Sequence, residues 1–259
     1  MPIPDPISAA LTLAHPSWRP ILAAGLGRMD PAYLSALAVD QYLPTGGRLF
    51  AAFALPLDAV RYVLVGEGPY PREQSATGVC FMDGAVEALW CDTGLSKPVN
   101  RATSLRNFMK MLLVAEGALS ADACAGDAMA PVAQAVRGGR YIATLNELQE
   151  NLTRHGFLLL NASLVFRPHV APAMDARAWL PFLQTVLEAL AVRAAPPKLV
   201  LWGKIAEQLK KLPETGRFEH LCAEHPYNLS FIRNPDMQAL FGPMQLLAPI
   251  RHPGERWDP

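Results

Sequence analysis

Four short apolar runs constrain the fold of this chain most, because each one ends abruptly in polar or turn residues. They span residues 61–66, 157–161, 199–203 and 218–225. Runs of this length that are rich in Val, Leu and Ile are typical of strands buried on both faces of a parallel sheet. The first three fit that description, whereas the fourth, FEHLCAEH, is more mixed in polarity.

Segments with helical periodicity separate these runs, at residues 104–115, 145–155 and 177–193. Ser104 stands where a serine cap would begin the first helix. Pro181 fits the first turn or two of the last one, where proline is tolerated. Strands that alternate with helices predict an α/β fold with a parallel sheet.

We therefore expect a single α/β domain with a central, mostly parallel four-stranded sheet flanked by helices. Its core should span about residues 42–247, with proline-containing peripheral arms at 1–20 and 249–259. The Ala/Gly-rich stretch 115–140 reads as a surface excursion, and we see no internal repeats.

The composition narrows the class of protein. Half of the 259 residues are hydrophobic, yet no apolar run reaches the length of a membrane span, and the N-terminus lacks the features of a secretory signal. The four cysteines are widely spread without a CxxC pair, which is typical of a reduced cytoplasmic protein. No clustered ligand set suggests a metal, and we expect no cofactor. The zero net charge counts mildly against a nucleic-acid binder, although a local basic groove suffices to hold phosphates.

Four segments place chemically useful side chains at or just after the ends of the predicted strands, where α/β sheets bind ligands. They are GEGPYP at 66–71, FLLLNASLVFRPH at 157–169, LVLWGK at 199–204 and HPYNLS at 225–230. In order and spacing they resemble the family-1 uracil-DNA glycosylases, from about Tyr42 to Leu247. The resemblance implies an enzyme that flips uracil, or a related deaminated base, out of DNA. It would hydrolyse the N-glycosidic bond and leave an abasic site for base-excision repair, acting as a cytoplasmic monomer whose partner is DNA and not a membrane.

The resemblance also implies how the base would be read. Tyr70, held between two prolines, would abut the C5 edge of uracil and exclude the methyl group of thymine. Phe81 would stack on the flipped base. Asn161 would donate to one base oxygen and accept from the ring N–H, a pattern that suits uracil and rejects cytosine.

Further residues would act on the leaving base and on the DNA backbone. His225 would donate a hydrogen bond to uracil O2 as negative charge develops there. Leu229 would fill the space of the extruded base. Ser104 and Ser230 match the serines that contact phosphates in the family. The chain departs from the family at Lys204, where the family has serine, but lysine can also meet a phosphate as a point charge.

Arg233, four residues after Leu229, is another candidate phosphate contact. This arginine and Lys204 are equally compatible with solvated surface charges.

The decisive departure is Gly68, which stands where the family has its catalytic aspartate. Three interpretations stay open. Glu67 substitutes for the aspartate, as in GEAPG-like motifs of other branches of the superfamily; another acid, such as Glu73 or Asp83, reaches the sugar; or the protein binds DNA and cleaves poorly. The first two predict a glycosylase with His225 and an acid as catalytic groups and with Gly68, Tyr70, Phe81 and Asn161 around the base.

The third interpretation predicts a catalytically weak homologue that binds uracil-containing or damaged DNA. An unrelated α/β hydrolase would need a GxSxG nucleophile elbow, and the chain has none.

Overall fold

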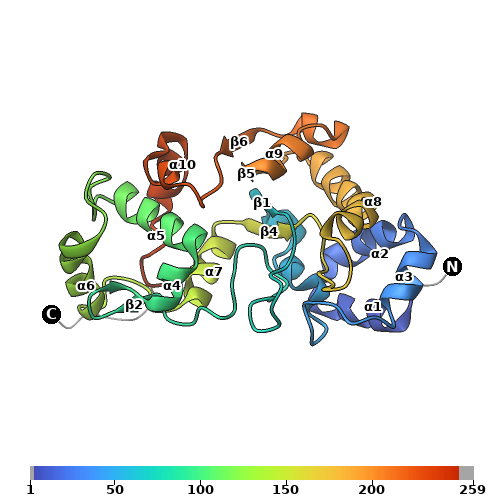
Figure 1. Ribbon diagram of the computed structural model, residues 1–259. Coiled ribbons are helices and arrows are strands. Elements are labelled where there is room, and N and C mark those ends of the chain that lie inside the picture. The colour runs from blue at the N-terminus through green and yellow to red at the C-terminus, as the bar shows by residue number, and fades with distance from the viewer. Residues whose placement is uncertain (1–2, 251–259) are drawn as a thin grey trace. The chain divides into compact units, whose positions relative to one another are not determined.

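The computed structural model describes residues 3–250 (Figure 1). Its contacts divide the chain into two compact units, which we describe separately. The sheet unit comprises Met1–Ala85 and Gly156–Ala223, and the helical unit comprises Val86–His155 and Glu224–Pro259. Among residues 3–250, no helix has the length and apolar character needed to cross a bilayer.

The sheet unit is built on four strands: β1 (Tyr62–Gly66), β4 (Phe157–Asn161), β5 (Lys198–Trp202) and β6 (His220–Ala223). Their order across the sheet is β4-β1-β5-β6, and every neighbouring pair is parallel. This confirms the predicted α/β class and its four-stranded parallel sheet. The β1 and β4 strands end level with each other, because Gly66 pairs with Asn161.

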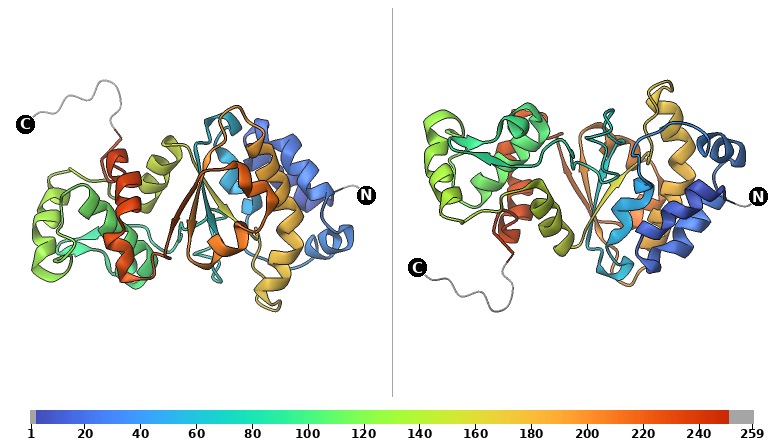
Figure 2. Two further views of the ribbon diagram at one scale, coloured as in Figure 1. Left: turned by 90° about the horizontal axis from the view of Figure 1, so that it is seen from above. Right: turned by 90° about the horizontal axis from the view of Figure 1, so that it is seen from below.

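Both faces of this sheet are buried, which explains why its strands are apolar without alternation. One face contributes alternate residues of β1, β4 and β5 to the main hydrophobic cluster; they are Val63, Val65, Leu158, Leu160, Leu199 and Leu201. Helices α2 (Arg19–Gly27) and α8 (Pro172–Ala191) pack together over that face (Figure 2). Leu64, Leu159 and Val200 point to the other face and are also buried.

The remaining helices of the sheet unit are short. They are α1 (Asp5–Ala10), α3 (Pro31–Leu37) and α9 (Lys204–Leu209), with 3-10 turns η1 (Leu11–Leu13), η2 (Pro16–Trp18), η3 (Arg48–Ala54), η4 (Leu57–Ala59) and η6 (Pro213–Arg217).

The prediction that residues 1–20 form a peripheral arm was wrong for the described part of that segment. Ile7 and Trp18 are fully buried in the main cluster. The Trp18 indole also donates a 2.7 Å hydrogen bond to the Leu55 carbonyl and packs edge-on against Phe53. Its prolines begin short helices and do not keep it from the core. Most of the predicted C-terminal arm lies outside the described residues.

The long helix also begins earlier than predicted, since α8 starts at Pro172. Pro181 therefore lies inside the helix and not in its first turns.

The helical unit carries a small antiparallel hairpin, β2 (Trp90–Cys91) and β3 (Gly94–Leu95), and several helices. These are α4 (Lys97–Arg101), α5 (Thr103–Ala115), α6 (Ala130–Arg137), α7 (Leu145–Arg154) and α10 (Pro235–Phe241), with 3-10 turns η5 (Gly126–Met129), η7 (Leu229–Arg233) and η8 (Gly242–Met244).

Two predicted details change in this unit. Ala102 precedes α5 without a side-chain cap, so the serine cap was wrong and Ser104 lies in the first turn. The stretch 115–140 is not purely a surface excursion, because it contains α6 and buries Val132 and Ala133.

Candidate active site

The GEGPYP loop leaves the carboxyl end of β1 and is held by the segment that follows β4. The Ala162 N–H donates to the Gly66 carbonyl at 2.8 Å, and the Ser163 N–H donates to the Glu67 carbonyl at 3.1 Å. Gly66 must be glycine, because a Cβ there would lie 2.5 Å from Cys80 Sγ and 3.0 Å from Asn161 Oδ1. The bare Cα of Gly66 thus lets Asn161 and Cys80 approach the end of β1.

Asn161 occupies the last position of β4, and only 5% of its surface is exposed. Its side-chain amide makes no hydrogen bond with any other residue in the described range 3–250. The amide atoms are not among the fully buried side-chain atoms that lack a partner, so they reach solvent although most of the residue is covered. This amide is therefore available to a ligand at the carboxyl edge of the sheet.

Tyr70 and Phe81 lie on the segments that follow β1. Burial raises the pKa of the Tyr70 hydroxyl above its ordinary value, and nearby Cys80 and Asp83 raise it further, so this phenol stays neutral. Phe81 has a φ of 69°, a left-handed conformation that is rare for a bulky side chain. Its ring packs edge-on against Trp202, the last residue of β5, with centroids 5.4 Å apart. Backbone strain of this kind is found mainly at functional sites.

The three carboxylates near this loop, Asp83, Glu73 and Glu67, differ in their hydrogen-bond partners. Asp83 is buried; it accepts a hydrogen bond from the Ala85 N–H at 2.9 Å and lies 3.7 Å from the Arg72 guanidinium. Glu73 accepts a 2.9 Å hydrogen bond from the Thr45 hydroxyl and lines a separate groove of about 510 Å³ that also contains Tyr42 and Phe166.

Glu67, in contrast, is exposed, and its carboxylate has no hydrogen-bond or ion-pair partner within the part of the chain that the structure describes.

Gly68 has room for a side chain. A Cβ at this position would meet only Ser163, with its carbonyl oxygen at 3.7 Å and its Cβ at 3.8 Å, which are ordinary contacts. Its φ also lies outside the left-handed region. Nothing in the local packing therefore requires glycine here, in contrast to Gly66.

His225 lies in the helical unit, two residues after the end of β6, and is exposed. Its Nδ1 accepts a 3.1 Å hydrogen bond from the Tyr227 N–H. With Nδ1 as the acceptor, Nε2 is the ring nitrogen that carries the proton of a neutral imidazole.

Asn107 holds the loop that carries His225, a role that the sequence did not suggest. Its fully buried amide on α5 donates to the Pro226 carbonyl at 2.7 Å, with the carbonyls of Tyr227 and Asn228 at 3.3 and 3.4 Å. An asparagine among the apolar residues of a helix was the only available signal. Asn107 fixes the position of the HPYNLS loop on α5.

The predicted DNA contacts of the helical unit are only partly available. Leu229 begins η7 with 68% of its surface exposed, as a wedge requires. Ser230 interacts with the Glu224 carboxylate and lowers the pKa of that group. Arg233 pairs with Asp122 at 2.8 Å, so a phosphate would have to compete for both of these side chains.

Ser104 lies in the first turn of α5 and is partly exposed. In the sheet unit, Lys204 is exposed at the start of α9, just after β5.

Each unit therefore gathers part of the predicted set. The sheet unit places the residues expected around the base on or near the carboxyl ends of its strands: Glu67, Gly68, Tyr70, Phe81 and Asn161. The helical unit places His225, Leu229 and Ser230 on one loop. Within residues 3–250, no three His, Cys, Asp or Glu side chains come together as a metal ion would need.

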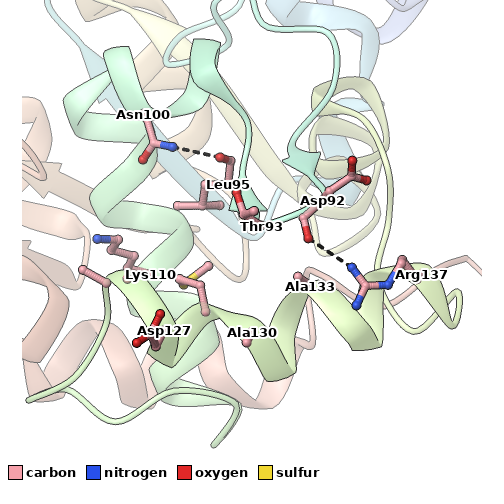
Figure 3. Close-up of a pocket in the computed structure, with 12 residues that line it drawn as sticks. Asp92, Thr93, Leu95, Asn100, Lys110, Asp127, Ala130, Ala133 and Arg137 are labelled. Carbon is pink, nitrogen blue, oxygen red and sulfur yellow. Dashed lines mark hydrogen bonds between the residues drawn. The ribbon is translucent and has the colours of Figure 1, made fainter.

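The helical unit has a further pocket of about 510 Å³, shown in Figure 3, that contains none of the predicted residues. In its wall Asn100 donates to the Leu95 carbonyl, and Arg137 donates to the Asp92 carbonyl. It lies outside the candidate site, and the 115–140 stretch provides part of its lining.

Open parallel α/β sheets bind their ligands outside the carboxyl ends of the strands, and this sheet presents an unpaired amide, that of Asn161, at that edge. Comparison with known proteins identifies the family. The crystal structure of wild-type UNG from Nitratifractor salsuginis is 39% identical, with a TM-score of 0.89, and the match covers 96% of this chain and 99% of that one. The crystal structure of a mutant of the same UNG gives a TM-score of 0.88. The chain belongs to the uracil-DNA glycosylase superfamily.

More distant relatives agree with this assignment. The uracil-DNA glycosylase of Corynebacterium glutamicum is 29% identical over 224 residues, covering 85% of this chain and 82% of the relative. The mimivirus uracil-DNA glycosylase is 18% identical with a TM-score of 0.52, and so it supports the fold alone. No protein-family model matches the chain.

Proposed function

We propose that this chain excises uracil from DNA with Glu67 and His225 as its catalytic groups, and that within the superfamily it stands closest to family 1. Uracil-excising glycosylase activity is the function of the family to which the chain belongs. The observation that carries the residue assignment is the Asn161 amide, which is buried and has no hydrogen-bond partner in the described range. Uracil offers the acceptor and the N–H that such an amide needs.

The sheet unit supplies the base pocket in this proposal. Asn161 pairs with the uracil edge, and Phe81 stacks on the ring. Tyr70 excludes a 5-methyl group, and as a neutral phenol it brings no charge next to the base. Cytosine presents its donor and acceptor in exchanged positions, so the same amide orientation rejects it.

Hydrolysis breaks the bond between C1′ and N1, and the electron pair leaves with the base. His225 Nε2–H donates to the oxygen on which that charge collects, which stabilises the leaving uracil anion. The sugar develops cationic character, and a carboxylate stabilises this charge and accepts the proton of the attacking water. Glu67 is the acid that we assign to this step, because the other two candidate acids, Glu73 and Asp83, are hydrogen-bonded to Thr45 and to the Ala85 backbone.

Contacts with the DNA backbone are assigned to Ser104, Lys204, Ser230 and Arg233, and the wedge to Leu229. DNA is thus the proposed partner. That the chain acts as a cytoplasmic monomer stays a prediction from the resemblance.

The test is cleavage of an oligonucleotide with a single uracil, followed by alkali to reveal abasic sites. Glu67→Gln should lower the single-turnover rate by about 10²–10⁴-fold. The matched control is Glu73→Gln, which removes a nearby acid just after the loop and should leave the rate within about threefold. His225→Ala and Asn161→Ala should each lose activity as well. Full activity in Glu67→Gln would refute the assignment of the acid.

The second candidate function is a DNA-binding homologue with little catalysis, which the glycine at position 68 favours. Wild-type protein that binds uracil-containing DNA without cutting it at high enzyme concentration would establish this alternative for uracil.

A further inference from the structure

The helical unit exposes two large hydrophobic side chains among its described residues, and both lie on the loop after His225. Tyr227 is 67% exposed and Leu229 is 68% exposed. Single exposed apolar residues are common on protein surfaces, but two within three positions of one loop form a local apolar projection. The resemblance assigns a role to Leu229 and none to Tyr227.

The loop that carries these side chains is rigid. Asn107 donates to the carbonyl groups of Pro226 and Tyr227 from the buried face of α5. The Tyr227 N–H donates to His225 Nδ1, and the Asn228 N–H donates to the His225 carbonyl at 2.9 Å. Both ends of the Tyr227 backbone are therefore fixed by hydrogen bonds.

The segment beyond the loop is anchored as well. Phe231 and Ile232 on η7 are 0% and 3% exposed. The chain is thus held on both sides of Tyr227 and Leu229, while these two side chains project into solvent. A rigid tyrosine presents a large aromatic surface and loses little conformational entropy on binding.

We propose that Tyr227 is a DNA-binding residue that stacks on a nucleobase next to the extruded uridine, beside the Leu229 wedge. This inference rests on the proposed function, since it takes the HPYNLS loop to contact DNA. Every base has a π-face, so stacking tolerates any neighbouring sequence. The chain has no net charge, and stacking supplies affinity that does not depend on phosphate contacts.

The test measures binding of the full-length protein to a short duplex that has a tetrahydrofuran abasic analogue in place of one deoxyuridine. This product mimic cannot be cleaved, and fluorescence anisotropy gives Kd over a range of salt concentrations. Tyr227→Ala should raise Kd at least fivefold and up to about 100-fold. Its slope of log K against log salt should stay that of wild type, because no phosphate contact is lost.

Three control variants define the mechanism. Tyr227→Phe keeps the ring and should bind within twofold of wild type. Val192→Ala, an exposed apolar residue of the sheet unit, should also have no effect. Lys204→Ala, which removes a proposed phosphate contact, should reduce the salt slope by about 1. The thermal midpoint of Tyr227→Ala should match that of wild type, since its side chain is exposed.

Several outcomes would overturn the inference. The first is a Kd of Tyr227→Ala within twofold of the wild-type value. The second is a Kd of Tyr227→Phe as high as that of Tyr227→Ala, and the third is a reduced salt slope in Tyr227→Ala. Uracil cleavage by wild type is measured in parallel. Cleavage without any effect of Tyr227→Ala on binding would refute only this inference, whereas ring-dependent binding without cleavage would refute only the proposed enzyme.

Discussion

Introducing an aspartate at position 68 tests the assignment of the catalytic acid directly. A Cβ at this position makes ordinary contacts, at 3.7 and 3.8 Å from atoms of Ser163, and the backbone is not left-handed. Gly68→Asp should therefore fold without strain, with a stability within about 1 kcal/mol of wild type. The new carboxylate would occupy the position of the family's catalytic aspartate.

The expected magnitude depends on whether Glu67 already works. If it does, Gly68→Asp alone should change the single-turnover rate by less than about tenfold. Glu67→Gln should lose about 10²–10⁴-fold, equal to roughly 3–5 kcal/mol of transition-state stabilisation. The double variant Glu67→Gln/Gly68→Asp should recover to within about tenfold of wild type, because the aspartate replaces the lost acid.

The assay is uracil release from a single-stranded oligonucleotide under single-turnover conditions, with enzyme in excess. Gly68→Asn is the control that adds the same volume without a charge, and it should not rescue Glu67→Gln. A Gly68→Asp variant that is 10² or more faster than wild type would refute the reasoning. It would show that the natural chain has no effective acid and that Glu67 takes no part in catalysis.

Three further predictions concern the residues that support the site. Asn107→Ala leaves the buried Pro226 carbonyl without its donor, so we expect a loss of about 1–3 kcal/mol in urea unfolding and a lower cleavage rate. An unchanged rate would mean that the loop needs no such support. Gly66→Ala brings a Cβ to 2.5 Å from Cys80 Sγ and should lower the free energy of unfolding by about 1–3 kcal/mol. Gly216→Ala is the control, because no atom lies within 4 Å of the added Cβ, and it should not destabilise the fold. Although burial raises the pKa of Glu224, hydrogen bonds from Ser230 and Asn234 lower it overall below its ordinary value of 4.5. The ionised carboxylate therefore stabilises the fold at pH values above its unfolded pKa, and this stabilisation is lost as the pH falls through the lower folded pKa. In Glu224→Gln, the unfolding midpoint should depend less on pH in this acid range. A pH profile identical to that of wild type would contradict the assignment.

The strands were predictable because burial on both faces leaves an unambiguous signal in the sequence. The apolar run at 157–161 contains no polar residue before Asn161, so the position of this amide at a strand end followed directly. The prediction for the N-terminal segment was wrong because its burial leaves no such local signal. Its prolines suggested an irregular arm, and the burial of Ile7 and Trp18 depends on residues more than thirty positions away, such as Phe53 and Leu55.

The support of the site was beyond sequence reasoning, because it depends on contacts between distant segments. Asn107 and the carbonyl of Pro226 are 119 positions apart, and nothing local marks either as a partner of the other. The left-handed backbone of Phe81 is also imposed by tertiary packing, since a phenylalanine does not favour it intrinsically.

The choice among the acids shows what the structure adds to a motif. In the sequence, Glu67, Glu73 and Asp83 are three carboxylates near one loop, and each could have replaced the missing aspartate. A structural hydrogen bond ties Asp83 to the Ala85 N–H and Glu73 to the Thr45 hydroxyl, so the positions of these two carboxylates are already set by other parts of the fold. The Glu67 backbone is pinned to Ser163, while its carboxylate has no partner in the described chain. A general base must be able to reach the water that it deprotonates, and a carboxylate without other partners on a fixed backbone is open to that contact, which makes Glu67 the first acid to test.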